Sequence, residues 1–223
     1  MIPQLMSVFT FLLWYYPIRL YRNAEWTDTV HSRAMTTFLI VWVFFIFTST
    51  FAHMLIAGLP NPDIAGAVLT LIFIVTFALC GVLAGPNDLP GFWVWVYRVN
   101  PLTYVIEGLL GTVLANAPIR CAPEEVVSFS PPNGSTCAEY MEGFIGAAGG
   151  YLVGNSGQSS DQCSYCAMDN TNTFLASLNA DFDNRWRNFG FLWVYVVFNI
   201  GAAIGLYWLA RVPKKSRVVA AKA

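Results

Sequence analysis

The sequence has 223 residues, of which 56% are hydrophobic and 11% are charged, and its mean hydropathy is +0.53. Soluble domains carry about 25% charged residues, so this composition indicates a membrane protein and argues against an ordinary soluble domain. The net charge of −1 offers no basic surface for nucleic acid.

Four hydrophobic segments predict membrane-spanning helices. They cover residues 4–20, 34–57, 64–84 and 189–210. Within the third, 20 residues carry no charge, which is the length needed to cross about 30 Å of hydrocarbon at about 1.5 Å per residue. The sequence lacks the basic region and cleavage site of a signal peptide. It starts abruptly inside an apolar run, so we expect a fragment of a longer protein or a truncated gene product.

The segment at residues 92–115 is also hydrophobic, but we do not expect it to cross the membrane. Arg98, Pro101 and Glu107 divide it into short pieces, and lipid tolerates neither unpaired charge nor broken backbone. We predict that the chain turns at residues 85–86 and re-enters the membrane part-way as a bent hairpin. Arg98 and Glu107 are then either functional groups at membrane depth or interfacial residues that pair with water or with each other.

Residues 116–187 differ in kind from the hydrophobic segments. They contain eight acidic and three basic residues, are rich in glycine, serine and asparagine, and hold four of the five cysteines. We predict a water-exposed, cysteine-rich loop before the last span.

Four cysteines in this loop, Cys121, Cys137, Cys163 and Cys166, allow three pairings. Structural disulfides are favoured over a metal site, because the loop has no histidine and a small outward-facing domain needs cross-links. A nested arrangement, Cys121–Cys166 around Cys137–Cys163, would close the loop at its base, and the outer bond would contribute roughly 4 kcal/mol. Cys80, in the third span, is expected to be an inert core residue.

The orientation in the membrane follows from three signals that do not all agree. The basic tail favours a cytosolic C-terminus, whereas Arg19, Arg22 and Arg33 in the first loop oppose the orientation that this implies. The loop cysteines and a glycosylation sequon at Asn133 decide the matter, because oxidation and glycosylation belong to the outer face. We predict that the large loop is extracellular.

One face of the third span carries Thr70, Ile74 and Phe77 at helical spacing. Two interpretations stay open: helix–helix packing, or the wall of a substrate cavity in which Val82 and Leu83 form an apolar constriction at the outer end. The sequence has no phosphate-binding loop and no catalytic motif, so we do not expect an enzyme. An enzyme inside the membrane is disfavoured because its candidate groups, His53, Cys80 and Glu107, are far apart in the sequence.

Several runs in order resemble the second transmembrane domain of fungal pleiotropic drug resistance ABC transporters, of the G subfamily. The resemblance covers nearly the whole chain and includes the loop cysteines. The runs are 14–17 (WYYP), 47–54 (FTSTFAHM), 80–84 (CGVLA), 89–93 (LPGFW), 100–104 (NPLTY), 185–190 (RWRNFG) and 207–213 (YWLARVP).

The resemblance implies an all-α polytopic membrane protein with the last four of twelve helices, short re-entrant helices and a disulfide-linked extracellular loop. On this basis residues 1–115 form part of an ABC2-type transmembrane domain, 116–187 the loop, 188–211 the last helix, and 212–223 a cytosolic basic tail. The nucleotide-binding domains, with their ATP and magnesium, and the first transmembrane domain would be partners outside this chain, which itself would hold no cofactor.

The implied activity is ATP-driven efflux of hydrophobic drugs, azole-type antifungals among them, from the plasma membrane. By resemblance, Thr70, Ile74 and Phe77 would line the substrate cavity, and Val82 and Leu83 would form the outer gate. The alternative is a truncated or non-transporting membrane protein that acts only as an assembly element.

Overall fold

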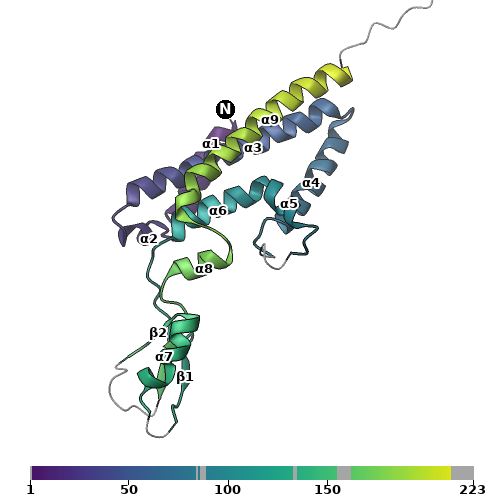
Figure 1. Cartoon of the computed structure of the whole chain (residues 1–223). Coiled ribbons are helices and arrows are strands. Elements are labelled where there is room, and N and C mark those ends of the chain that lie inside the picture. Colours follow the sequence, from purple (N-terminus) through teal and green to yellow (C-terminus); the bar gives the residue numbers. More distant parts are fainter. Residues whose placement is uncertain (1, 84, 86–88, 133–134, 155–161, 212–223) are drawn as a thin grey trace, which may run out of the picture. The chain divides into compact units, whose positions relative to one another are not determined.

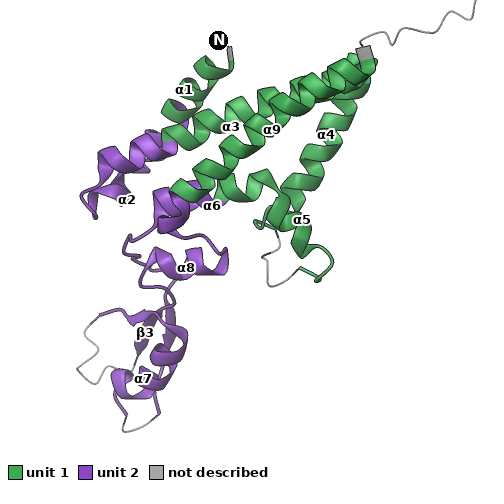
Figure 2. Cartoon of the chain, turned by 45° about the horizontal axis from the view of Figure 1, so that its top comes forward, with its two compact units in different colours: residues 1–12, 38–106, 186–223 green, residues 13–37, 107–185 purple. Residues whose placement is uncertain are grey.

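The computed structural model describes residues 2–83, 85, 89–132, 135–154 and 162–211. The chain divides into two compact units (Figure 2). Unit 1 consists of Met1–Leu12, Phe38–Ile106 and Trp186–Ala223, and unit 2 of Leu13–Thr37 and Glu107–Arg185.

Two helices are long and apolar enough to cross a membrane, judged by length and composition among the described residues. They are α3, Val30–Gly58, and α9, Arg185–Arg211. Together with the 3-10 turn that precedes it, α9 gives a helical stretch over Phe182–Ala210 that contains the apolar window. Only 17% of each apolar window is buried inside the chain, which is low for the core helix of a soluble protein. These helices confirm that the second and fourth hydrophobic segments are long helices.

In unit 1, α3 and α9 lie side by side (Figures 1 and 2). Their contact includes an edge-to-face ring pair, Trp42 with Trp193, at 5.9 Å between centroids. Farther along, Asn199 Nδ2 donates a 3.4 Å hydrogen bond to Thr50 Oγ1. Aromatic packing and one polar contact therefore join the two long helices.

The other two predicted spans are shorter than expected. Helix α1 covers Ile2–Tyr15 rather than residues 4–20, and it is followed by turns and by α2, Tyr21–Glu25. Pro17 explains the early end, because a proline disfavours helical backbone at the residue before it. Helix α4 covers Pro62–Ala78 rather than residues 64–84. At 17 residues it is about 26 Å long, less than the roughly 30 Å of a hydrocarbon core.

The predicted interruption at Pro101 is present. It separates α5, Val94–Val99, from α6, Pro101–Leu114. Asn100 has extended backbone, and its Oδ1 accepts a hydrogen bond from Leu102 N at 3.0 Å, which caps the start of α6. The Asn100 Nδ2 group donates to the carbonyl of Thr76 in α4 at 2.6 Å. The break in the hydrophobic segment is thus a capped corner that is hydrogen-bonded to α4.

The loop region of unit 2 corrects the expectation of an all-α protein, because it contains a three-stranded antiparallel sheet in the order β1-β3-β2. The strands are β1, Val127–Phe129, β2, Tyr151–Leu152, and β3, Cys163–Cys166. The hydropathy pattern that predicts membrane helices carries no information about this polar, cross-linked region. Three short helical elements accompany the sheet: α7, Cys137–Ala148, α8, Thr171–Ser177, and a 3-10 turn, Phe182–Asn184.

The disulfides have the nested arrangement, Cys121–Cys166 around Cys137–Cys163, with Cα–Cα distances of 5.9 and 5.7 Å. Both bonds end on β3, which they tie to the start of α7 and to residue 121. Cys80 is buried and free. Asn133 lies outside the described residues.

Candidate functional site

The face of α4 that carries Thr70, Ile74 and Phe77 is exposed in unit 1. Ile74 is 65% exposed and Phe77 56% exposed, and none of the three residues lines the cavity described below. The hydroxyl of Thr70 donates to the carbonyl of Gly66 at 2.9 Å, so its polar group is satisfied within the helix. The result is an apolar surface on α4 that is not covered by the described part of unit 1.

Val82 and Leu83 follow the end of α4 and are also exposed. The residue before them, Gly81, has a backbone φ of +94°, a conformation that favours glycine. The chain therefore changes direction at Gly81, and the two apolar side chains stand outside the helix rather than on its last turn.

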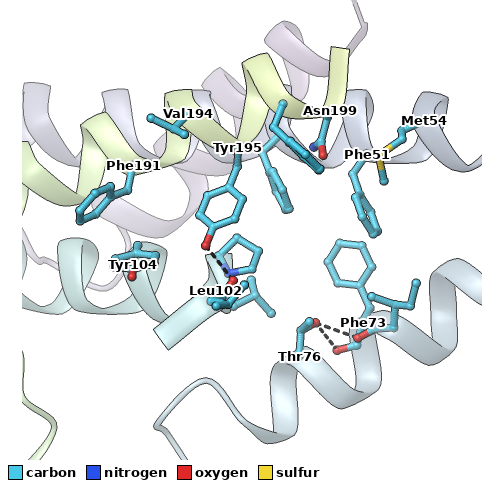
Figure 3. Close-up of a pocket in the computed structure, with 15 residues that line it drawn as sticks. Phe51, Met54, Phe73, Thr76, Leu102, Tyr104, Phe191, Val194, Tyr195 and Asn199 are labelled. Carbon is cyan, nitrogen blue, oxygen red and sulfur yellow. Dashed lines mark hydrogen bonds between the residues drawn. The ribbon is translucent and has the colours of Figure 1, made fainter. Parts of the chain in front are cut away.

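A second feature of unit 1, which the sequence did not indicate, is a cavity of about 630 Å³ next to a different face of α4 (Figure 3). Its walls come from α3, α4, the α5–α6 corner and α9. The lining residues, mostly aromatic and aliphatic, are Phe47, Phe51, Met54, Ile72, Phe73, Thr76, Val99, Pro101, Leu102, Tyr104, Phe191, Val194, Tyr195, Phe198 and Asn199.

Aromatic contacts fix the cavity walls. The ring of Phe51 meets those of Phe47 at 5.8 Å and Phe73 at 6.4 Å, and Tyr104 meets Phe191 at 5.0 Å, measured between centroids. Such pairs favour defined ring orientations. The walls are therefore shaped by side chains from helices that are distant in sequence, which explains why the sequence did not reveal the cavity.

The hydroxyl groups at the cavity already have hydrogen-bond partners. Tyr195 donates to the carbonyl of Val99 at 2.7 Å and Tyr104 to that of Arg98 at 2.6 Å, as Figure 3 shows for Tyr195. Thr76 donates to carbonyls of its own helix, at 2.9 and 3.0 Å. None of the described lining residues is charged. The cavity has the chemistry of a site that binds an apolar molecule, with no acid, base or nucleophile to transform one.

The charged residues singled out in the sequence have structural contacts. In unit 2, Glu107 is buried and accepts a hydrogen bond from Asn184 Nδ2 at 3.2 Å. In unit 1, Arg98 is exposed and its carbonyl receives the hydroxyl of Tyr104. Neither of these contacts indicates a catalytic role.

Arg33 in unit 2 is a buried arginine in α3, although its place between two hydrophobic segments predicts a loop charge. Its Nη1 donates to the carbonyls of Thr112 and Ala115, at 3.2 and 2.7 Å, and its guanidinium lies 4.8 Å from the centre of the Phe182 ring. A cation at these carbonyls satisfies the C-terminal end of α6 and complements the helix dipole. Arg33 is therefore a structural residue, and it should not be counted as a loop charge when the membrane orientation is deduced.

Comparisons with known proteins agree with this description of a helical membrane segment. The sequence profile of the ABC-2 type transporters matches residues 2–114. ABC multidrug transporter F of Aspergillus fumigatus is 52% identical over 208 residues, which are 93% of this chain and 14% of that protein. ABC multidrug transporter atrG of Aspergillus oryzae is 48% identical over 96% of this chain, and AFR2 of Cryptococcus neoformans is 46% identical over 95%.

This chain spans about 14% of the length of each of these relatives. The match extends through the hydrophobic segments and the cysteine-rich loop alike, because it covers more than nine-tenths of the chain. The profile match over half of the residues and the identity over nearly all of them establish that the chain belongs to the ABC-2 type transporter family, as a segment of the membrane domain found in fungal multidrug transporters.

Proposed function

We propose that the chain is a membrane-domain portion of an ATP-driven exporter of hydrophobic drugs and xenobiotics. The observation that carries the proposal is the uncovered apolar face of α4. Thr70, Ile74 and Phe77 lie there, exposed within unit 1, on a helix that carries no charge after Asp63. Such a face requires lipid, a ligand or another part of the protein to cover it.

In this proposal the face of α4 is one wall of a substrate cavity whose other walls belong to the rest of the transporter. An aromatic and aliphatic wall with few hydrogen-bonding groups selects ligands loosely, by size and hydrophobicity. That property fits the export of chemically diverse compounds, which the relatives' names describe as multidrug transport.

Val82 and Leu83 would form the outer constriction of the pathway. Both are apolar and exposed, and Gly81 turns them away from the end of α4. A narrow apolar ring can block water and ions while it yields to a hydrophobic compound. The gate would open when the helices move during the transport cycle.

The energy would come from nucleotide-binding domains outside this chain, which would bind ATP and magnesium. The transporter would lie in the plasma membrane, with four spans in this chain, the large loop and Asn133 outside, and the basic C-terminal tail in the cytosol. The nested disulfides support an extracellular loop, because stable disulfides belong to oxidising compartments.

Phe77→Ala, made in the transporter that carries this chain, tests the cavity assignment. Resistance to a panel of hydrophobic compounds and drug-stimulated ATP hydrolysis would be measured in cells and membranes that lack other exporters. We expect the resistance profile to change most for large aromatic compounds, because the ring that contacts them is lost. Val75→Ala is the matched control, since Val75 is an exposed apolar residue of the same helix on a different face and does not line the cavity.

If Phe77→Ala and Val75→Ala leave the same profile as the unmodified transporter at equal surface expression, the cavity assignment is wrong. If the unmodified transporter confers no resistance and shows no drug-stimulated hydrolysis, the chain belongs to a non-transporting membrane protein.

A further inference from the structure

We propose that the cavity beside α4 in unit 1 binds a membrane sterol, meaning a flat, rigid hydrocarbon with a single hydroxyl group. The inference goes beyond the export function, because this cavity borders a different face of α4 from the one assigned to the transport pathway. It stands or falls independently of that assignment.

The size and lining of the cavity fit a small apolar molecule. Its volume of about 630 Å³ lies within the roughly 300–1,000 Å³ of small-molecule sites, which are lined mainly by hydrophobic and aromatic side chains with a few polar groups. Seven of the fifteen lining residues are aromatic. The cavity therefore has the dimensions and the surface of a binding site rather than of a packing defect.

The position of the cavity indicates that its ligand comes from the bilayer. Two of its walls belong to α3 and α9, the helices long enough to cross a membrane. Phe47 and Phe51 contribute from α3, and Phe191 and Tyr195 from α9. A molecule that reaches these walls has to be soluble in hydrocarbon.

The absence of charge among the described lining residues argues against a phospholipid head group or a fatty acid. A phosphate or carboxylate in such a site would be desolvated without a cationic partner, which is costly. A rigid ligand is favoured over a flexible acyl chain of similar apolar area, because it loses less conformational freedom on binding.

Asn199 supplies a polar anchor for one hydroxyl. Its side chain is 2% exposed and belongs to the lining, where Figure 3 shows the amide beside the aromatic residues. The structure gives this amide one hydrogen bond, the 3.4 Å contact from Nδ2 to Thr50 Oγ1. An amide offers two donor hydrogens and an acceptor oxygen, so Asn199 retains capacity to bind a hydroxyl group. The other hydroxyl groups of the lining donate to backbone carbonyls.

The test is photolabelling of the full chain in phosphatidylcholine nanodiscs with a sterol that carries a diazirine group. We expect crosslinked peptides from residues 47–54, 72–76 and 191–199. Unlabelled sterol should compete for these sites, whereas its 3-methyl ether, which cannot donate a hydrogen bond, should compete about tenfold less well. A fatty acid should not compete.

Two pairs of variants locate the site. Val194→Trp adds a ring at the mouth of the cavity, where Val194 is 65% exposed, and should abolish most labelling. Its control, Val197→Trp, places the same ring on the same helix at a residue that is 66% exposed and outside the lining, and should label normally. Asn199→Leu should remove the preference for the free hydroxyl. Thr50→Val removes the contact with Asn199 and the bonds of the Thr50 hydroxyl to its own helix, but it keeps the Asn199 amide and should preserve that preference.

Three results would overturn the proposal: crosslinks outside the cavity segments, equal competition by the fatty acid, or equal effects of the two tryptophan variants. Equal competition by a transported aromatic drug and by sterol would assign the cavity to drugs instead. The competition series on the unmodified chain decides these points even if a variant does not fold.

Discussion

Gly81 packs against the aromatic ring of Tyr97. Its backbone φ is +94°, and a Cβ atom at this position would lie 2.7 Å from Tyr97 Cε2. Tyr97 is buried in α5, so the ring has little room to withdraw. The contact joins the chain just after α4 to α5, directly before Val82 and Leu83.

Gly81→Ala should destabilise the protein by about 1–3 kcal/mol, because alanine is strained at positive φ and its methyl group would clash with Tyr97. Thermal unfolding of the purified protein in detergent measures the effect. Gly66→Ala is the control, since a Cβ atom there meets nothing within 4 Å and alanine favours a helix. Equal unfolding temperatures for the two variants would contradict the assigned turn.

Arg33→Ala should lower stability more than Arg33→Lys, and both more than Arg22→Ala. Arg33 is 3% exposed and its guanidinium binds two carbonyls, whereas Arg22 is exposed. Each hydrogen bond to a charged group contributes about 1.5–3 kcal/mol. Lysine can replace the Nη1 donor, but it cannot replace Nε, which donates to Thr29 Oγ1 at 2.9 Å, or the planar guanidinium beside the Phe182 ring. The comparison of unfolding temperatures checks the order, and a lysine variant as stable as the parent would show that charge alone suffices.

The disulfides should be stable in the native protein and should differ from Cys80 in reactivity. We expect alkylation of the denatured, unreduced protein to modify Cys80 and to leave the four loop cysteines unmodified. Replacing Cys121 and Cys166 together by serine should destabilise the loop by roughly 4 kcal/mol, since this bond closes the longer segment. Peptide mapping that finds another pairing would refute the nested arrangement.

Asn133→Gln tests the orientation of the loop. If the loop is extracellular, the protein expressed in a fungal host should carry an N-linked glycan that enzymatic deglycosylation removes and that the variant lacks. Protease protection of the C-terminal tail in sealed vesicles checks the other side of the membrane. Access to the loop around Asn133 from the cytosolic side alone would reverse the proposed topology.

The sequence predicted the features that hydropathy and spacing determine. Long apolar helices at α3 and α9, the break at Pro101 and a cysteine-rich loop before the last helix are all present. Each depends on local composition or on a residue with a fixed backbone preference.

Other features depend on contacts between distant segments, and the sequence did not reveal them. Helix α4 ends at Ala78 although apolar residues continue to Ala84, because hydropathy does not report where backbone hydrogen bonding ends. An evenly apolar helix also does not show that Thr76 borders a cavity while Ile74 stays exposed. The sequence does not show that Arg33 is buried and paired, because the carbonyls it binds, those of Thr112 and Ala115, lie 79 and 82 residues away along the chain.

The corner between α5 and α6 has a mechanical consequence. Asn100 holds the carbonyl of Thr76 in α4, and the neighbouring carbonyl of Val99 holds the hydroxyl of Tyr195 in α9. Two adjacent residues of the corner are thus hydrogen-bonded to both helices. A movement of α4 relative to α9 would either break one of these two bonds or move the corner as well. A displacement of either helix would therefore be passed directly to α5 and α6.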